Sequence, residues 1–369
     1  KNGNLRGNRC RRTAQQMTAP ITRIAPDFAL LKKTGFDSII DVRSPSEFLD
    51  DHMPGAINLP VLNDAQRSEI GTIYKQINPF EAKRSGAALV AQNIAGHLQT
   101  DLAKKDRDWR PLIYCWRGGQ RSGAMAKIFS DIGWHSAVIE GGYKSYRKAV
   151  LDDLDHLPAK FRLIVLSGPT GTAKTHILRA AAENGLQVLD LEGLANHRGS
   201  LLGSEPGSPQ PAQRLFESRL CAALQNFSPD RPVFIEAESN KIGQIHVPSA
   251  LWASMRQASR VRLTAPIDAR IAFLQRDYRY IIEQPDHLIA LLAGLRQRYS
   301  VATFDHWESA IKAADWHGFV SNLLETHYDP SYARSAASRP LTEIQTLRAT
   351  TLDDDDIGRL AKALGTLDR

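Results

Sequence analysis

The chain of 369 residues is long enough for two or three domains, and its 42% hydrophobic content is that of a globular protein, which argues against wholesale disorder. It has no run of about 18 apolar residues and no apolar segment near its N-terminus, so neither a membrane-spanning helix nor a secretory signal peptide is predicted. Five basic residues in the first twelve positions supply most of the net charge of +7 and leave +2 for the rest of the chain. This charge permits a nucleic-acid partner without indicating one.

The three cysteines, Cys10, Cys115 and Cys221, are too few for a disulfide framework. A reducing cytoplasm is therefore the expected compartment, and it would keep a reactive thiol intact. Residues 1–22 are polar, basic and aperiodic, which predicts a disordered extension. Met17 is a candidate for the natural start, with the residues before it an upstream extension.

Residues 23–151 are predicted to form a first α/β domain. Expected strands are 38–43, 57–60, 112–114 and 137–140, and expected helices are 45–48, 62–108 with a break at 78–79, 124–132 and 144–150. Strands that alternate with helices are typical of a parallel sheet, which binds ligands at the carboxyl ends of its strands. Asp41, Cys115 and Glu140 stand at such ends, and Asp41 is taken as a supporting acid.

The first candidate site is the glycine-rich turn between strand 112–114 and the next helix. Backbone N–H groups would converge there on an anion beside a helix N-terminus. The predicted anion-binding residues are Arg117, Gly118, Gly119, Arg121 and Ser122. These surroundings favour thiolate over thiol, so Cys115 is predicted to be a nucleophilic catalytic residue. The plainer alternative is a buried cysteine at a strand end.

The charged residues 152–160 are predicted to be a linker, helical or open, before a P-loop-containing domain at 161–335. Strand 163–166 and helix 177–183 flank a second glycine loop, which nearly matches G-x-x-x-x-G-K-[ST]. The predicted phosphate-binding residues are Gly168, Thr170, Gly171, Thr172, Ala173, Lys174 and Thr175.

In this loop Lys174 would neutralise phosphate, and the Thr175 hydroxyl is a candidate Mg²⁺ ligand. Ala173 stands where the motif has glycine, at a cost of about 1–2 kcal/mol if the position needs a left-handed backbone. A glycine-rich turn that binds nothing is the alternative. The loop's ligand therefore stays open between nucleoside triphosphate, another diphosphate and RNA phosphate.

Further strands of this domain are expected at 188–192, 232–238 and 261–264, and each of the first two ends in acids. The predicted supporting acids are Asp190, Glu192, Glu236 and Glu238. Glu236 or Glu238 could organise a Mg²⁺ ion, and a solvated strand end is the alternative for these two. Helices are expected at 216–224, where Cys221 is core, and over 269–324, followed by a break at 327–330. Residues 336–369 are predicted to be a C-terminal tail with a short helix.

The first domain resembles the rhodanese family. The resemblance rests on Asp41-Val42-Arg43, Glu47-Phe48, residues 53–60 and the loop from Cys115 to Ser122. Rhodaneses that act as sulfurtransferases have four residues between Cys and Arg, whereas five separate Cys115 from Arg121 here. The wider loop suits a phosphate-sized anion and also matches Cys-dependent phosphatases.

The two domains together resemble the tRNA 2-selenouridine synthase family. The combination includes residues 115–122, 140–144, 190–195, 197–200, 236–239 and 328–330, and covers about 36–335. The resemblance implies geranylation of the wobble 2-thiouridine of tRNA with geranyl diphosphate, then replacement of the geranylated sulfur by selenium from selenophosphate. Cys115 would carry selenium, and the P-loop would hold a diphosphate.

The resemblance also implies partners. They are tRNA bearing wobble 2-thiouridine and an enzyme that makes selenophosphate. Neither a membrane partner nor a tightly bound organic cofactor is expected for this protein. Arg198 and the basic segment 144–148 are candidate contacts to RNA or phosphate, with a solvated surface as the alternative. Two other functions compete: a sulfurtransferase or Cys-x5-Arg phosphatase with a nucleotide-binding domain, and a non-catalytic P-loop regulator. Tyr114 precedes Cys115 where many phosphatases have His, which disfavours the phosphatase.

Overall fold

The computed structural model describes residues 21–26, 35–200, 202–203, 207–237, 239–337 and 342–368. The chain divides into two compact units, one made of Lys1–Phe48 and Gly55–Tyr146, the other of Leu49–Pro54 and Arg147–Arg369. The extension expected at 1–22 lies outside the described residues except for its last two. Over the described ranges, no helix is both long enough and apolar enough to cross a bilayer.

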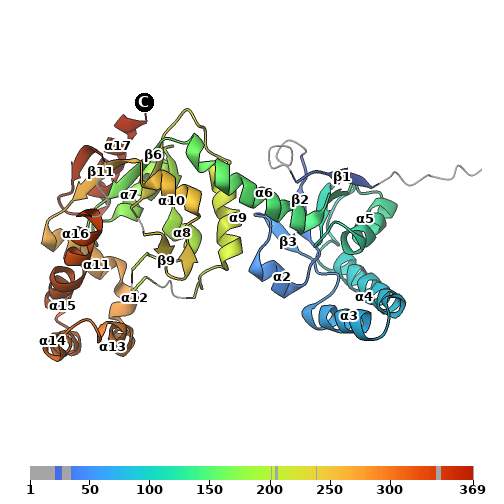
Figure 1. The fold of residues 1–369 in the computed structure, drawn as a ribbon, viewed down its shortest axis with the longest axis horizontal. Coiled ribbons are helices and arrows are strands. Elements are labelled where there is room, and N and C mark those ends of the chain that lie inside the picture. The colour runs from blue at the N-terminus through green and yellow to red at the C-terminus, as the bar shows by residue number, and fades with distance from the viewer. Residues whose placement is uncertain are drawn as a thin grey trace, which may run out of the picture. The chain divides into compact units, whose positions relative to one another are not determined.

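The first unit is built on a five-stranded parallel sheet with the strand order β1-β5-β4-β2-β3. Its strands β1, β2 and β3 are labelled in Figure 1. Its strands are β1 (Thr22–Ile24), β2 (Ser38–Asp41), β3 (Ala56–Asn58), β4 (Pro111–Tyr114) and β5 (Ala137–Ile139). Its helices are α2 (Pro45–Asp50), α3 (Asp64–Gln76), α4 (Pro79–Gln99), α5 (Gln120–Ile132) and the start of α6 (Gly142–His156), which ends in the second unit. β4 lies in the middle of the sheet, so the residue that follows it emerges between the neighbours β2 and β5.

Packing of α4 and α5 against the strands makes the core of this unit. Ile94 of α4, Phe129 of α5 and Ile113 of β4 are each fully buried. The ring centroids of Trp109 and Trp134 lie 5.8 and 5.1 Å from that of Phe129, tilted and edge-on respectively, and 5.0 Å from each other. This packing fixes α5, and with it the helix N-terminus that follows Cys115.

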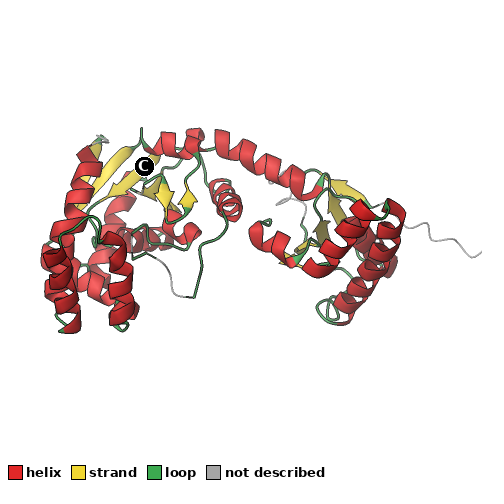
Figure 2. Ribbon diagram, turned by 60° about the horizontal axis from the view of Figure 1, so that its bottom comes forward, coloured by secondary structure: helices red, strands yellow, loops and turns green. Residues whose placement is uncertain are grey.

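The second unit has its own five-stranded parallel sheet, ordered β12-β11-β6-β8-β7. Its strands are β6 (Leu163–Ser167), β7 (Gln187–Leu189), β8 (Val233–Glu236), β11 (Ser259–Thr264) and β12 (Glu343–Arg348), with a small antiparallel hairpin of β9 (Lys241–Ile242) and β10 (Ile245–His246). Figure 2 shows the strands of this sheet surrounded by helices. The expected α/β class with two parallel sheets is confirmed.

Helices make up most of the second unit. They are α7 (Lys174–Glu183), α8 (Leu191–Ala195), α9 (Gln213–Leu224), α10 (Ser249–Met255), α11 (Ile267–Asp277), α12 (Arg279–Ile282), α13 (Pro285–Leu292), α14 (Val301–Lys312), α15 (Trp316–Leu323), α16 (Asp329–Ala337) and α17 (Asp354–Leu364), with short turns η1 (Pro158–Lys160), η2 (Ala293–Leu295), η3 (Leu324–Tyr328) and η4 (Gly365–Leu367). α12 to α15 share a separate apolar cluster around the fully buried Trp307.

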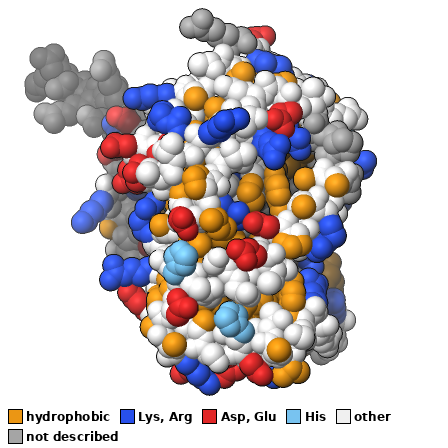
Figure 3. All heavy atoms as spheres, turned by 90° about the vertical axis from the view of Figure 1, so that its left-hand side faces the viewer, with side chains coloured by type: hydrophobic (Ala, Val, Ile, Leu, Met, Phe, Trp, Pro, Cys, Tyr) orange, Lys and Arg blue, Asp and Glu red, His pale blue; other side chains and the backbone are white. Residues whose placement is uncertain are grey.

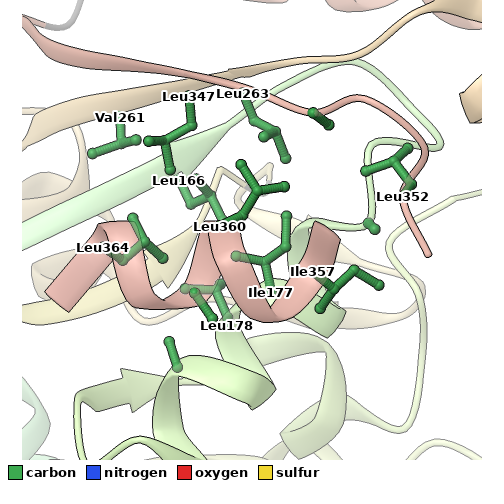
Figure 4. Packing of buried hydrophobic residues seen from close by; sticks show 14 of the residues in the cluster. Leu166, Ile177, Leu178, Val261, Leu263, Leu347, Leu352, Ile357, Leu360 and Leu364 are labelled. Carbon is green, nitrogen blue, oxygen red and sulfur yellow. The ribbon is translucent and has the colours of Figure 1, made fainter. Parts of the chain in front are cut away.

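The last described segment is part of the second core. β12 is hydrogen bonded to β11, and α17 packs on α7. Leu360 and Leu364 of α17 lie against Ile177 and Leu178 of α7 and against the strands (Figure 4). Residues 342–368, which were predicted to belong to a C-terminal tail, therefore pack on and stabilise α7, the helix that follows the P-loop.

The helix expected to reach residue 108 ends at Gln99, the strand β1 was not predicted, and two further elements differ from the expectation. The strand expected over 188–192 ends at Leu189, because Asp190 caps α8 by accepting a hydrogen bond from Gly193 N at 2.6 Å. The break expected at 327–330 is wrong: the chain passes through the π-helical turn η3 straight into α16. Pro330 is the second residue of α16 and directly follows the π-helical turn.

Candidate functional site

Cys115 follows β4 directly and opens a loop that leads to α5. Its carbonyl oxygen accepts a hydrogen bond from Tyr143 N at 2.8 Å. Gly118 and Gly142 both have φ of +61°, and a Cβ would lie 2.5 Å from Ile139 O at the first and 2.2 Å from Cys115 O at the second. Only glycine allows this approach, so the glycines in the two loops lock the Cys115 loop onto the end of β5.

Hydrogen bonds hold the Cys115 thiol and favour its ionised form. Gly119 N and the Ser122 hydroxyl donate to Sγ at 3.3 and 3.2 Å, and the residue is only 4% exposed. Burial alone would raise the pKa of this thiol, but hydrogen bonds from Ser122 and from the backbone of Arg117 and Gly119 lower the pKa below its usual value. Cys115 is therefore a candidate thiolate nucleophile.

Ser122→Ala should raise the pKa of Cys115, because Sγ loses a donor while the burial that opposes ionisation remains. Alkylation by iodoacetamide, followed by mass spectrometry of the Cys115 peptide, should then need higher pH. Since the folded-state pKa is lowered, the thiolate stabilises the fold above the unfolded pKa, and that contribution is lost as pH falls through the folded pKa. Burial raises the pKa of Cys221 to about 12, so Cys221 is the unreactive internal control. An unchanged Cys115 profile would contradict this account.

Two arginine–carboxylate pairs lie in the same unit. Asp41 at the end of β2 is fully buried and binds Arg43, with Oδ2 2.6 Å from Nη2, while the Arg43 guanidinium lies 3.9 Å from the Tyr143 ring centroid. Asp41, which was predicted to be a supporting acid, therefore forms a buried ion pair that positions Arg43. Arg121 is half-buried and pairs with Glu47, with Nη1 2.9 Å from Oε2.

Arg43 and Glu47 were not predicted to be site residues, although both occur in the rhodanese-like motifs. Glu47 also accepts a hydrogen bond from Ser44 N at 3.1 Å, so it orients Arg121 from the first turn of α2. Arg117 is exposed, as are Lys144 and Lys148 on one face of α6. These cations can reach a ligand from solvent.

The P-loop joins β6 to α7 in the second unit. Ala173 has φ 57° and ψ 28°, so the position that departs from the motif does adopt the left-handed backbone. Gly171 has φ of +82°, and a Cβ there would lie 2.8 Å from Leu274 Cδ1. Lys174 Nζ donates to Gly168 O at 2.9 Å, so the loop closes around its own lysine.

Ala173→Gly should change stability little, although the residue is only 5% exposed. Relief of about 1–2 kcal/mol of left-handed strain offsets roughly 0.8 kcal/mol for the lost methyl and about 0.4–1 kcal/mol from a more flexible unfolded chain. Ala181→Gly is the matched control, because Ala181 is fully buried in the right-handed interior of α7. It should lose about 1–2 kcal/mol. Equal losses in urea unfolding would refute the strain at Ala173.

The acids expected around the P-loop have different roles. Glu192 Oε2 accepts a hydrogen bond from the Thr175 hydroxyl at 2.7 Å, which places two oxygen ligands together in the loop region. Asp190 caps α8 and pairs with Arg179 at 2.8 Å. Glu236 is buried and accepts a hydrogen bond from Leu191 N at 3.1 Å. Glu238 lies outside the described residues.

Thr175 and Glu192 fit Mg²⁺, which binds through one or two protein oxygens together with phosphate and water. No group of three or more His, Cys, Asp or Glu side chains in the described part of the chain is placed to hold a metal ion. The hydrogen bond to Glu192 would orient the Thr175 hydroxyl toward such an ion.

Sequence reasoning missed a buried arginine that fixes the P-loop. Arg270 of α11 donates from Nε to Thr170 O at 2.8 Å and pairs with both carboxylate oxygens of Asp329. Arg198 pairs with Asp277 and lies 4.8 Å from the ring centroid of Tyr278. The only sequence signal for Arg270 was Asp329, a member of one of the family-like motifs.

A cavity of about 590 Å³ contains the P-loop. Besides the loop, its walls include Glu192, Arg198 and three tyrosines, Tyr278, Tyr328 and Tyr332. The face of the second unit seen in Figure 3 mixes Lys and Arg with Asp and Glu, with apolar side chains between them. This face is therefore not uniformly positive, and the cations beside the P-loop are the cavity-lining residues Lys174, Arg179 and Arg198.

The two units thus each present a strand–glycine loop–helix arrangement suited to an anion. In the first, the anion would meet a thiolate, which can act as a nucleophile. In the second, it would meet Lys174, backbone N–H groups and a helix N-terminus, which can stabilise charge on a phosphate leaving group. The predicted loop residues are brought together within each unit.

Comparisons with known proteins match both units. Residues 161–298 match the model of the tRNA 2-selenouridine synthase AAA domain, and residues 26–149 match that of the rhodanese-like domain. Three proteins named tRNA 2-selenouridine synthase are among the similar ones. The one from Nitrosomonas europaea is 35% identical over 65% of this chain and 63% of its own length, which is less than two thirds. Those from Psychromonas ingrahamii and Shewanella frigidimarina are 30% and 31% identical over 80% of this chain and over 86% and 87% of their own lengths.

Proposed function

The chain belongs to the tRNA 2-selenouridine synthase family, and on that premise we propose that it converts the wobble 2-thiouridine of tRNA to 2-selenouridine in two steps. The first step transfers a geranyl group to sulfur, and the second replaces the geranylated sulfur with selenium. The observation that carries the proposal is that one chain combines a loop lowering the pKa of its cysteine with a P-loop cavity.

The P-loop is proposed to bind the diphosphate of geranyl diphosphate. The sulfur of 2-thiouridine attacks C1 of the geranyl group, the C1–O bond breaks with its electron pair on the diphosphate, and the base loses its N3 proton. Lys174 and the loop N–H groups lower the barrier by neutralising charge on the departing diphosphate. A Mg²⁺ at Thr175 and Glu192 would add further charge neutralisation.

The Cys115 loop is proposed to bind selenophosphate, supplied by a separate selenophosphate-producing enzyme. The net exchange is redox neutral: selenium takes the place of sulfur at C2, geranyl thiol leaves, and the phosphoryl group ends as phosphate after reaction with water. Backbone N–H groups from Gly119 onward and the cation of Arg121 are the loop's means of holding the phosphoryl oxygens.

A Cys115 thiolate can enter this exchange by attack on selenium or on phosphorus. Attack on selenium makes Cys115 the selenium carrier, but it leaves phosphorus reduced and so requires an oxidant to restore phosphate. Attack on phosphorus breaks the P–Se bond, sends its electron pair to selenide, and leaves a phosphoryl group on Sγ for hydrolysis. We favour the second route because it needs no redox partner. Phosphorus-31 NMR of protein that has reacted with selenophosphate distinguishes the two routes, because only the second leaves a phosphoryl group on Sγ.

Transfer RNA must reach both loops. The proposed contacts to the RNA backbone are the exposed cations on α6, Lys144 and Lys148, together with Arg198 in the P-loop cavity.

The test of the whole proposal is mass spectrometry of nucleosides from 2-thiouridine-bearing tRNA. With geranyl diphosphate alone, a geranyl mass gain is expected, and added selenophosphate should exchange sulfur for selenium. Unchanged RNA in the presence of folded protein would refute the proposal and favour a phosphatase or sulfurtransferase.

A further inference from the structure

A second, apolar cavity adjoins the P-loop cavity within the same unit. Its volume is about 60 Å³. The two cavities share five lining residues, Thr170, Ser200, Leu274, Tyr278 and Tyr328. Thr170 belongs to the P-loop itself, so the apolar space begins directly at the phosphate-binding backbone.

The lining of this cavity is aliphatic and aromatic and comes from the helical part of the unit. α12 and α13 contribute Ile281 and Leu288, and α15 contributes Trp316, Phe319 and Val320. Among the described lining residues none is charged. Water gains few hydrogen bonds in such a space, and a hydrocarbon group gains about 0.8 kcal/mol for each methylene that it buries.

A ligand that fills both cavities needs an anionic end and an apolar end. We propose that the apolar cavity receives the hydrocarbon chain of the prenyl diphosphate whose diphosphate lies on the P-loop. This assignment rests on the proposed function, and it adds where the chain lies and what limits its length. The reactive carbon, which joins the two ends, then falls at the junction lined by Tyr278 and Tyr328.

The inner wall sets the length of chain that fits. Leu288 and Phe319 are 2% and 3% exposed and belong to the packed cluster of α12 to α15. A chain longer than the cavity meets this wall and must either displace it or leave part of itself in water. The short cavity therefore selects short prenyl chains, and Val320, which is only half-buried, is the position where an added side chain fills the space with least disturbance.

The experiment is calorimetric binding of inorganic diphosphate and geranyl diphosphate to the full chain without tRNA. Geranyl diphosphate should bind at least about tenfold more tightly than inorganic diphosphate, since two buried methylenes already supply that factor. Val320→Phe should remove this advantage and leave diphosphate binding unchanged. Val301→Phe is the matched control, because Val301 is 76% exposed on α14, and it should retain the advantage.

A chain-length series on the unaltered protein gives a second test that does not depend on a variant. Affinity should rise from dimethylallyl to geranyl diphosphate and gain nothing further with farnesyl diphosphate. Equal affinity for inorganic and geranyl diphosphate, or an advantage that survives Val320→Phe, would overturn the chain subsite. Diphosphate binding that is absent, or insensitive to Lys174→Ala, would instead overturn the proposed use of the P-loop.

Discussion

Cys115→Ala should abolish the exchange of sulfur for selenium and leave geranylation of 2-thiouridine unchanged. The thiol is the group of its loop whose pKa is lowered, and a thiolate is a strong nucleophile toward selenophosphate. Loss of a nucleophile typically costs at least about a thousandfold in rate. In the proposed mechanism, geranylation uses the P-loop of the other unit and does not involve the thiol.

The measurement is nucleoside mass spectrometry with geranyl diphosphate alone and then with selenophosphate. Cys221→Ala is the matched control, because it removes the same atoms from a buried cysteine whose pKa is raised by burial and which therefore ionises less readily. Both steps should proceed in that variant. Selenium exchange that persists in Cys115→Ala, or geranylation lost with it in a folded protein, would contradict this division of labour.

Lys174→Ala should lower the rate of geranylation by at least about a hundredfold, since the P-loop loses the cation that is proposed to neutralise the leaving diphosphate. The ammonium now donates to Gly168 O inside the loop, so its loss also removes a hydrogen bond that closes the loop. Exchange of selenium should stay at its normal rate when the variant receives tRNA that is already geranylated. That bypass separates a failed first step from a failed fold.

Lys312→Ala is the control for Lys174, because Lys312 is an exposed lysine of the same unit that pairs only with its helix neighbour Glu308. It should behave as the unaltered protein in both steps. If Lys174→Ala geranylates normally, the P-loop does not hold the diphosphate. If the variant also fails on geranylated tRNA, the loop contributes to RNA binding or to both steps.

Both glycine loops could be predicted from sequence because their chemistry is local. A strand, a glycine turn and a helix are continuous in each, and even the cost of Ala173 was foreseeable from its place in the motif. Asp190 shows the limit of this reasoning: its acid was taken as a strand end, but its side chain caps a helix and so ends the strand early. Capping competes with strand extension through a single hydrogen bond, which periodicity does not reveal.

Features built from distant segments were missed for a different reason. Arg270 reaches the P-loop across 100 positions of the chain, and the apolar cavity is lined mainly by α11, α12, α13, α15 and η3, which come well after the loop it adjoins. In sequence, those helices show only ordinary amphipathic patterns. The side chains that face a common space are decided by tertiary packing, for which a single sequence carries no direct signal.

The docking of α17 on α7 has a consequence for how the protein is made. During synthesis β6, the P-loop and α7 leave the ribosome well before β12 and α17, and until then Ile177 and Leu178 lack the partners seen in Figure 4. A ribosome adding about 5–20 residues per second takes many seconds to cover that interval. The nascent second unit therefore exposes the apolar face of α7 until β12 and α17 have been synthesised. We expect chaperones to bind the second unit during this interval. In the first unit, by contrast, all five strands have been synthesised before α6 is complete.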